Sequence, residues 1–184
     1  MKSIYIRTIG SVQGYICEGL ISVFGDLLQR RVKLIHDTDY PLLAFEPKRN
    51  QYYARTIIEI LFQILPKDCE KMICVTDVDL CTPILTFVYG EAQLDGKIAV
   101  VSTNRLKQEF YNLPGNDNLL LQRLVKECLH ELGHCYGLVH CTSKYCVMYF
   151  SSNIINIDNK QCHYCVRCQD YFMAKTRKEE HGQE

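Results

Sequence analysis

The sequence lacks several features that would each place it in a particular class of protein. It contains no run of about 18 apolar residues, so we expect no transmembrane helix and no membrane partner. Neither sign of charge dominates, because 21 basic residues balance 21 acidic ones, and we therefore expect no nucleic-acid partner. No internal repeat or low-complexity tract interrupts the 184 residues, a length that fits one domain.

Cysteine is the residue present in unusual number, with eleven copies. The odd count, and an N-terminal segment that is typical of a strand rather than of a signal peptide, argue against a secreted disulfide scaffold. We therefore expect a protein of the reducing cytoplasm. Six cysteines are interpreted as small, partly buried apolar side chains: Cys17, Cys69, Cys74, Cys81, Cys128 and Cys135.

The segment HELGHCYGLVHC, residues 130–141, carries the strongest chemical signal. His130 and His134 are four residues apart, which places both imidazoles on one face of a helix. Gly137 can leave that helix in a left-handed conformation and so return His140 as a third ligand. Three imidazoles suit zinc and leave one coordination position open, which is typical of a catalytic site. Glu131 lies beside the first ligand, where it can act as a general base. The alternative is a helix with surface histidines.

A second group of soft ligands follows directly. Cys141, Cys146, Cys165 and Cys168 can surround one zinc ion as four thiolates, which makes a closed, structural site. Cys162 forms an overlapping CxxC with Cys165 and is the alternative for one of the four positions. The other interpretation of this group is a set of free buried thiols.

Periodicity predicts the order of elements along the chain. We expect strands over 3–8, 32–36, 71–78, 85–93 and 97–103, and helices over 14–31, 50–65 and 119–136, with a loop over 37–48 and a frayed tail after Ala174. The first strand, helix and strand predict a parallel crossover. Asp95-Gly96 predicts a hairpin. Its first strand is either an exposed edge, able to pair with an extended peptide, or an ordinary covered edge.

The combined pattern HExxHxxGxxHC, CxM and CxxC resembles that of the archaemetzincins. The residues that carry it are His130, Glu131, His134, Gly137, His140, Cys141, Cys146, Met148, Cys165 and Cys168. Upstream segments around Arg49, Gln51, Tyr89 and Gly90 are also similar to family segments, so the resemblance spans most of the chain from Arg49 to Phe172. The interval between Met148 and Cys165 and the extra Cys162 depart from the family pattern, which leaves the fourth cysteine ligand open.

The resemblance implies an α/β (α+β) protein with the metzincin-type zincin fold. This fold has a mixed, mostly parallel twisted sheet with one antiparallel edge strand, a backing helix and an active-site helix. An upper subdomain, 1–137, would hold the sheet and active-site helix, and a lower one, 138–184, the Met-turn at Met148 and the structural zinc. The resemblance also implies two zinc ions, one catalytic and one structural. We expect a monomer.

The leading functional hypothesis is a zinc-dependent metallopeptidase that acts on peptide or protein substrates, with Glu131 as general base. Aminopeptidase and endopeptidase activity both remain open. Tyr149 follows the Met-turn and is either a second oxyanion donor or, as we favour, a packing residue. The alternatives are a non-catalytic zinc-binding interaction protein and a zinc hydrolase that acts on a non-peptide amide.

Overall fold

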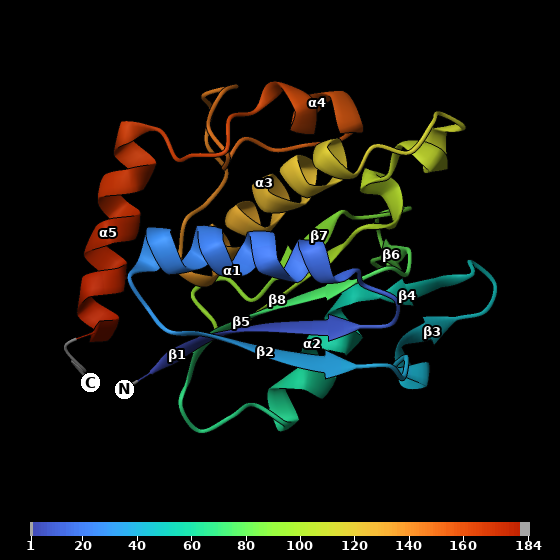
Figure 1. Ribbon diagram of the computed structural model, residues 1–184, viewed down its shortest axis with the longest axis horizontal. Coiled ribbons are helices and arrows are strands. Elements are labelled where there is room, and N and C mark those ends of the chain that lie inside the picture. The colour runs from blue at the N-terminus through green and yellow to red at the C-terminus, as the bar shows by residue number, and fades with distance from the viewer. Residues whose placement is uncertain (1, 181–184) are drawn as a thin grey trace.

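The computed structural model describes residues 2–180 and has a twisted five-stranded sheet at its centre (Figure 1). The strands, in spatial order, are β2 (Val32–Asp37), β1 (Ser3–Ile9), β5 (Cys69–Thr76), β8 (Ile98–Ser102) and β7 (Gly90–Ala92). The first four are parallel, and β7 is antiparallel to β8. All eight residues of β5 are buried, as its central place requires. The predicted fold class is confirmed.

Helices cover both faces of the sheet. Helix α1 (Gly14–Leu28) and helix α3 (Asp117–Cys135) lie on one face, and helix α2 (Ala54–Gln63) lies on the other, as Figure 1 shows. Alternate residues of β5 therefore enter different cores: Ile73 packs beneath α1 and α3, whereas Met72 packs beneath α2. Because α3 packs on the sheet, its C-terminal end, which carries His130 and His134, has a fixed position relative to the sheet.

A small second sheet corrects two of the predictions. Its strands are β3 (Phe45–Glu46), β4 (Gln51–Tyr53) and β6 (Leu80–Cys81), preceded by the short helix η1 (Leu42–Ala44). The predicted loop over 37–48 therefore contains paired backbone, and the helix predicted from Asn50 begins only at Ala54. Residues 51–53 pair with β3 and β6, so tertiary pairing replaces the first turn that local periodicity suggested.

The predicted strand over 85–93 is wrong for its first half, because only Gly90–Ala92 forms β7. Helix α1 also ends at Leu28, three residues before the predicted limit, where Gln29 takes a left-handed conformation with φ 52°. The hairpin itself is confirmed, with β7 and β8 paired antiparallel across the Asp95-Gly96 turn.

Two C-terminal helices, α4 (Ile154–Asn159) and α5 (Val166–Glu180), were not predicted. The prediction of a frayed tail after Ala174 is wrong as far as Glu180, because α5 continues to that residue. The rest of the predicted tail lies outside the described residues. Phe172 of α5 packs against Tyr136 and stacks on Tyr164, with ring centroids 4.9 and 4.7 Å apart. Helix α5 lies at the end of the molecule where α1 ends (Figure 1), and Arg30 donates to the Thr176 carbonyl there (3.4 Å).

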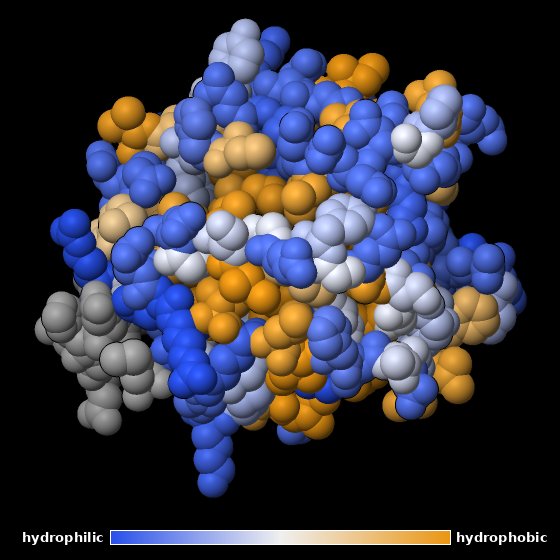
Figure 2. All heavy atoms as spheres, in the orientation of Figure 1, coloured by the Kyte–Doolittle hydropathy of each residue, from blue (hydrophilic) through white to orange (hydrophobic). Residues whose placement is uncertain are grey.

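On the face seen in Figure 2, hydrophobic residues emerge between hydrophilic ones rather than as one continuous area. Within residues 2–180, no helix is both long and apolar enough to cross a membrane.

Candidate metal centres

Helix α3 brings the first two histidines together one turn apart. The Nε2 atoms of His130 and His134 lie 3.1 Å apart, and the His140 ring lies 5.3 and 5.0 Å from theirs, centroid to centroid. One ligand atom from each of the three residues lies within 4.8 Å of the others. Ligands about 2.0 Å from a tetrahedral zinc are about 3.3 Å apart, so the spacing of the donors fits a single ion.

Gly137 makes the return of His140 possible. Its φ is +84°, in the left-handed region, and its N–H donates to the His134 carbonyl (2.9 Å). The next amide, that of Leu138, donates to the Gly133 carbonyl (2.9 Å). These two bonds satisfy helix-terminal carbonyls and reverse the chain, which is the local reason why His140 faces the helix.

Backbone carbonyls orient the two helical imidazoles. Nδ1 of His130 donates to the Val147 carbonyl (2.8 Å), and Nδ1 of His134 donates to the Leu138 carbonyl (2.7 Å). Because a carbonyl can only accept, each Nδ1 carries the proton and each Nε2 presents a lone pair to the centre. Burial lowers the pKa of His130 well below its ordinary value and also lowers the pKa of His134 and His140. Neutral imidazoles with converging lone pairs are the donor set that zinc prefers.

Glu131 is buried beside this centre, against the edge strand. A Cβ placed on Gly90 of β7 would lie 2.9 Å from Glu131 Oε1, so the carboxylate fills the space that a side chain would occupy. Burial raises the pKa of Glu131 well above its ordinary value, Glu127 raises it further, and Lys160 opposes this. Burial therefore gives the Glu131 carboxylate a higher proton affinity than a carboxylate in water has.

A cleft of about 450 Å³ opens onto these residues. His130, His134, His140 and Glu131 line its floor, residues 85–92 form one wall, and residues 150–152 form the other. The histidine centre is therefore exposed on one side, where a substrate can approach.

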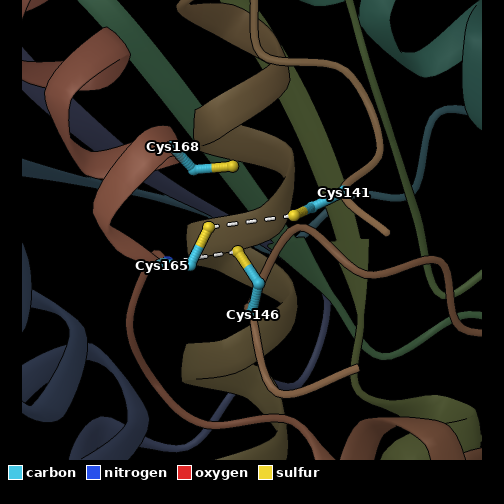
Figure 3. Close-up of side chains that lie close together, drawn as sticks. All are labelled: Cys141, Cys146, Cys165 and Cys168. Atoms are coloured by element: carbon cyan, nitrogen blue, oxygen red, sulfur yellow. Dashed lines mark hydrogen bonds between the residues drawn. The ribbon is translucent and has the colours of Figure 1, made fainter. Parts of the chain in front are cut away.

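The cysteine cluster joins the chain after α3, which carries Cys141 and Cys146, to the start of α5, where Cys165 and Cys168 lie (Figure 3). The four sulfur atoms of Cys141, Cys146, Cys165 and Cys168 all lie within 4.8 Å of one another, and those of Cys141 and Cys165 are 3.8 Å apart. Tetrahedral thiolates about 2.3 Å from zinc are about 3.8 Å apart, whereas a disulfide needs about 2.05 Å. The donor set therefore fits a closed four-thiolate site.

The remaining cysteines lie elsewhere. Cys162 is exposed, with its Sγ 4.0 Å from the Gln122 carbonyl, and it is not part of the four-sulfur group. Cys128 and Cys135 are buried in the core beneath α3. None of these three thiols contributes to either ligand group among the described residues.

Met148 and Tyr149 take different environments. Met148 is fully buried beneath α3, where a Cβ on Gly133 would lie 2.5 Å from its Sδ. Tyr149 lines a separate hollow with Lys144 and Asn156, outside the cleft, which supports its packing role. Met148 therefore packs beneath the helix that carries His130 and His134, and Tyr149 is not part of the lining of the cleft.

Sequence reasoning missed a buried ion pair beside the centre. Lys160 is 2% exposed, and its Nζ donates to Glu127 Oε1 (2.7 Å) and to the Tyr149 carbonyl (3.3 Å). Glu127 lies one turn before Glu131 on α3 and also lines the cleft. The four-residue spacing from Glu131 was a signal that could have placed Glu127 on the active face.

Comparisons with known proteins agree with one another. Residues 33–173 match peptidase family M54. Archaemetzincin of Methanocaldococcus jannaschii is 39% identical over 90% of this chain and 89% of its own, and that of Thermococcus kodakarensis is 40% identical over 92% and 94%. The crystal structure of Methanopyrus kandleri archaemetzincin has a TM-score of 0.83 at 30% identity, covering 96% of both chains. A zinc-dependent peptidase of Methanocorpusculum labreanum has a TM-score of 0.84 at 30% identity, covering 92% of this chain and all of its own.

Proposed function

The chain belongs to peptidase family M54 and is a zinc metallopeptidase, and we propose that it hydrolyses peptide bonds at the histidine centre with Glu131 as general base. The observation that carries this proposal is the combination of three converging imidazoles, a buried carboxylate beside them and a cleft open on one side. A structural zinc site has all four positions filled by protein ligands, so it needs neither an open position nor a carboxylate beside one.

In this proposal each chain holds two zinc ions. His130, His134 and His140 hold the catalytic ion, and the four-cysteine group holds a structural one in the lower subdomain, 138–184. The spacing of both donor sets supports the assignment. A zinc ion among the imidazoles supplies Lewis-acid polarisation of the scissile carbonyl and lowers the pKa of water.

Glu131 moves the proton. Its carboxylate takes a proton from the attacking water as the C–O bond forms, and it gives that proton to the amide nitrogen as the C–N bond breaks. Its burial against Gly90 supports this role, because a carboxylate held by its neighbours keeps the same position through both proton transfers.

The edge strand β7 is suited to bind the substrate backbone. Tyr89 and Gln93, which flank β7, are hydrogen-bonded to β8, and the alternation of an antiparallel ladder directs the backbone groups of Gly90 and Ala92 away from β8. An extended peptide can add to this edge as a further strand. Both an aminopeptidase and an endopeptidase fit this arrangement.

We also propose a monomer that works in a reducing cytoplasm and has no nucleic-acid partner. All eleven cysteines lie within the described residues and none of them forms a disulfide, which supports the reducing compartment. The balanced charge supports the absence of nucleic acid among its partners.

The experiment that tests the mechanism is Glu131→Gln. We expect peptide cleavage on a broad peptide library to fall by about 10²- to 10⁴-fold while zinc content stays at the wild-type value. Glu59→Gln is the matched control, because the Glu59 carboxylate is exposed on α2 and is not part of the cleft lining. Full activity in Glu131→Gln would refute the base assignment, and a wild-type protein without turnover on any peptide would favour the zinc-binding interaction protein or a hydrolase of non-peptide amides.

A further inference from the structure

One wall of the cleft has no secondary structure to hold it. Residues 82–87, which we call the rim, connect β6 to the segment before β7 and contribute Thr82, Leu85, Thr86 and Phe87 to the cleft lining. Among the described residues, no backbone group of the rim is hydrogen-bonded to another backbone group. A segment of this kind has many conformations available unless side chains fix it.

The guanidinium of Arg49 binds three backbone carbonyls of the rim. Arg49 Nη1 donates to the Thr82 carbonyl (2.8 Å), and Arg49 Nη2 donates to the carbonyls of Leu85 (2.7 Å) and Thr86 (2.6 Å). These are charge-assisted bonds from a rigid planar donor, so together they define one shape of the rim.

Gln51 orients that guanidinium and adds a further bond. Its Oε1 accepts from Arg49 Nε (2.8 Å), and its Nε2 donates to the Thr86 carbonyl (3.0 Å) and to Asp79 Oδ2 (2.7 Å). Asp79 is itself held by a bidentate pair with Arg105, at 2.7 and 2.8 Å. Gln51 is only 5% exposed, so the base of this network is fixed within the fold.

Arg105 supports the other end of the rim. Its guanidinium lies 4.2 Å from the centroid of the Phe87 ring, and Phe87 packs edge-on against Tyr89 at 5.2 Å. The rim thus presents Phe87 and the half-exposed Leu85 to the cleft from a scaffold of two arginines.

We propose that Arg49 is a positioning residue for substrate binding, because it holds the rim in the conformation that lets Leu85 and Phe87 contact an apolar side chain of the peptide. Arg49 acts through the rim and is not part of the cleft lining. The inference rests on the proposed peptidase function, since it concerns the affinity of the same cleft.

The test is a comparison of Arg49→Ala with wild type on a peptide that carries a bulky apolar residue next to the cleaved bond. We expect KM to rise about tenfold, equivalent to about 1.4 kcal/mol of binding, with kcat and zinc content near the wild-type values. Arg49→Lys should recover only part of the loss, because one ammonium cannot bind three separated carbonyls. Arg55→Ala is the matched control, since the Arg55 guanidinium pairs with Glu59 on an exposed part of α2.

Limited proteolysis gives a second readout that needs no activity. Chymotrypsin should cleave at Leu85 or Phe87 several-fold faster in Arg49→Ala than in wild type or Arg55→Ala, because the rim opens more often. If Arg49→Ala does not fold, Arg49→Gln serves instead: a single side-chain amide cannot replace all three bonds to the carbonyls of Thr82, Leu85 and Thr86, so KM should again rise.

The outcomes separate the two proposals. An unchanged KM in an active Arg49→Ala protein would overturn the role of Arg49. So would a rise in KM accompanied by an equal fall in kcat and by loss of zinc, because that result would indicate general damage to the site. A wild-type protein that cleaves no peptide would instead count against the proposed function, while the proteolysis experiment would still report whether Arg49 holds the rim.

Discussion

The histidine centre and the cysteine cluster are neighbours in the chain, yet they differ in their exposure to solvent. His140 is exposed and faces a cleft of about 450 Å³, whereas Cys141, the next residue, is 5% exposed. Cys146 and Cys168 are buried as well. Consecutive residues after α3 therefore belong to two different kinds of site. The histidine centre is open to solvent, as catalysis requires, and the cysteine cluster is closed, as a structural site requires.

The two sites are nevertheless linked through the segment 138–147. The carbonyls of Leu138 and Val147 orient His134 and His130, and the Val147 N–H donates to the His163 carbonyl (3.0 Å) in the segment that leads to Cys165. The geometry of all three imidazoles thus depends on a stretch of chain that the cysteine cluster fastens to α5. Removing the ligands of each site in turn tests whether the cysteine cluster supports the histidine centre and not the reverse.

The largest effect is expected when the cysteine cluster is removed. Cys165→Ser combined with Cys168→Ser should release the structural zinc and lower the melting temperature by more than about 10 °C, because structural zinc contributes folding free energy on the order of 10 kcal/mol in small domains. Zinc affinity at the histidine centre should fall too. His140→Ala should lose one zinc equivalent and shift the melting temperature only slightly. Equal destabilisation by the two variants, measured by calorimetry with metal analysis, would contradict the proposed division of roles.

Metal removal from the wild-type protein should proceed in a fixed order. A chelator should take the zinc of the histidine centre first and abolish turnover, because that site opens onto the cleft. The cysteine-bound zinc should remain until the protein unfolds, since three of its four ligand residues, Cys141, Cys146 and Cys168, are buried. Zinc content and peptide cleavage measured together against chelator concentration check this order. Simultaneous loss of both ions would show that burial does not distinguish the sites.

A third prediction concerns the contact between the edge strand and the base. Gly90→Ala would place a Cβ 2.9 Å from both Glu131 Oε1 and the Val100 carbonyl, so the carboxylate must shift. We expect kcat to fall by up to about 10²-fold, the cost of a displacement of about 1 Å in a catalytic group, with both zinc ions retained.

The control for this variant is Gly25→Ala. The added Cβ meets no neighbouring atom there, so activity should be unchanged and the helix should gain up to about 1 kcal/mol of stability. Steady-state kinetics and thermal unfolding of both variants give the comparison. Unaltered kcat in Gly90→Ala would mean that Glu131 is not held by β7.

The sequence alone predicts the parts of the site that depend on local spacing. The four-residue interval from His130 to His134 and the left-handed turn at Gly137 need only helix geometry, and the structure has both. The parallel pairing of β1 with β2 and the hairpin of β7 and β8 need only apolar runs, a helical period and one turn signal. Periodicity cannot predict contacts between distant segments. An example is the packing of Phe172 on Tyr136, which stabilises α5 against the end of α3.

The rim is the clearest case of this limit. Residues 85–93 have the apolar character of a strand, but side chains of Arg49 and Gln51 bind the carbonyls that a neighbouring strand would need. Likewise, no local pattern identifies the Val147 carbonyl as the partner of His130, because the two are brought together only by the turn after α3.

The smallest effect is expected for Cys162→Ser, which tests the boundary of the closed site. Cys162 was the sequence-based alternative for one ligand position, yet its sulfur is exposed and contacts the Gln122 carbonyl at 4.0 Å rather than the other thiols. We expect two zinc equivalents, the same order of release to a chelator and a stability change within about 0.5 kcal/mol, as for an ordinary surface substitution. Cys165→Ser is the matched variant and should lose the structural zinc. If Cys162→Ser lost that ion instead, one ligand of the cluster would be exposed to solvent, and the contrast between an open histidine centre and a closed cysteine cluster would no longer explain their different roles.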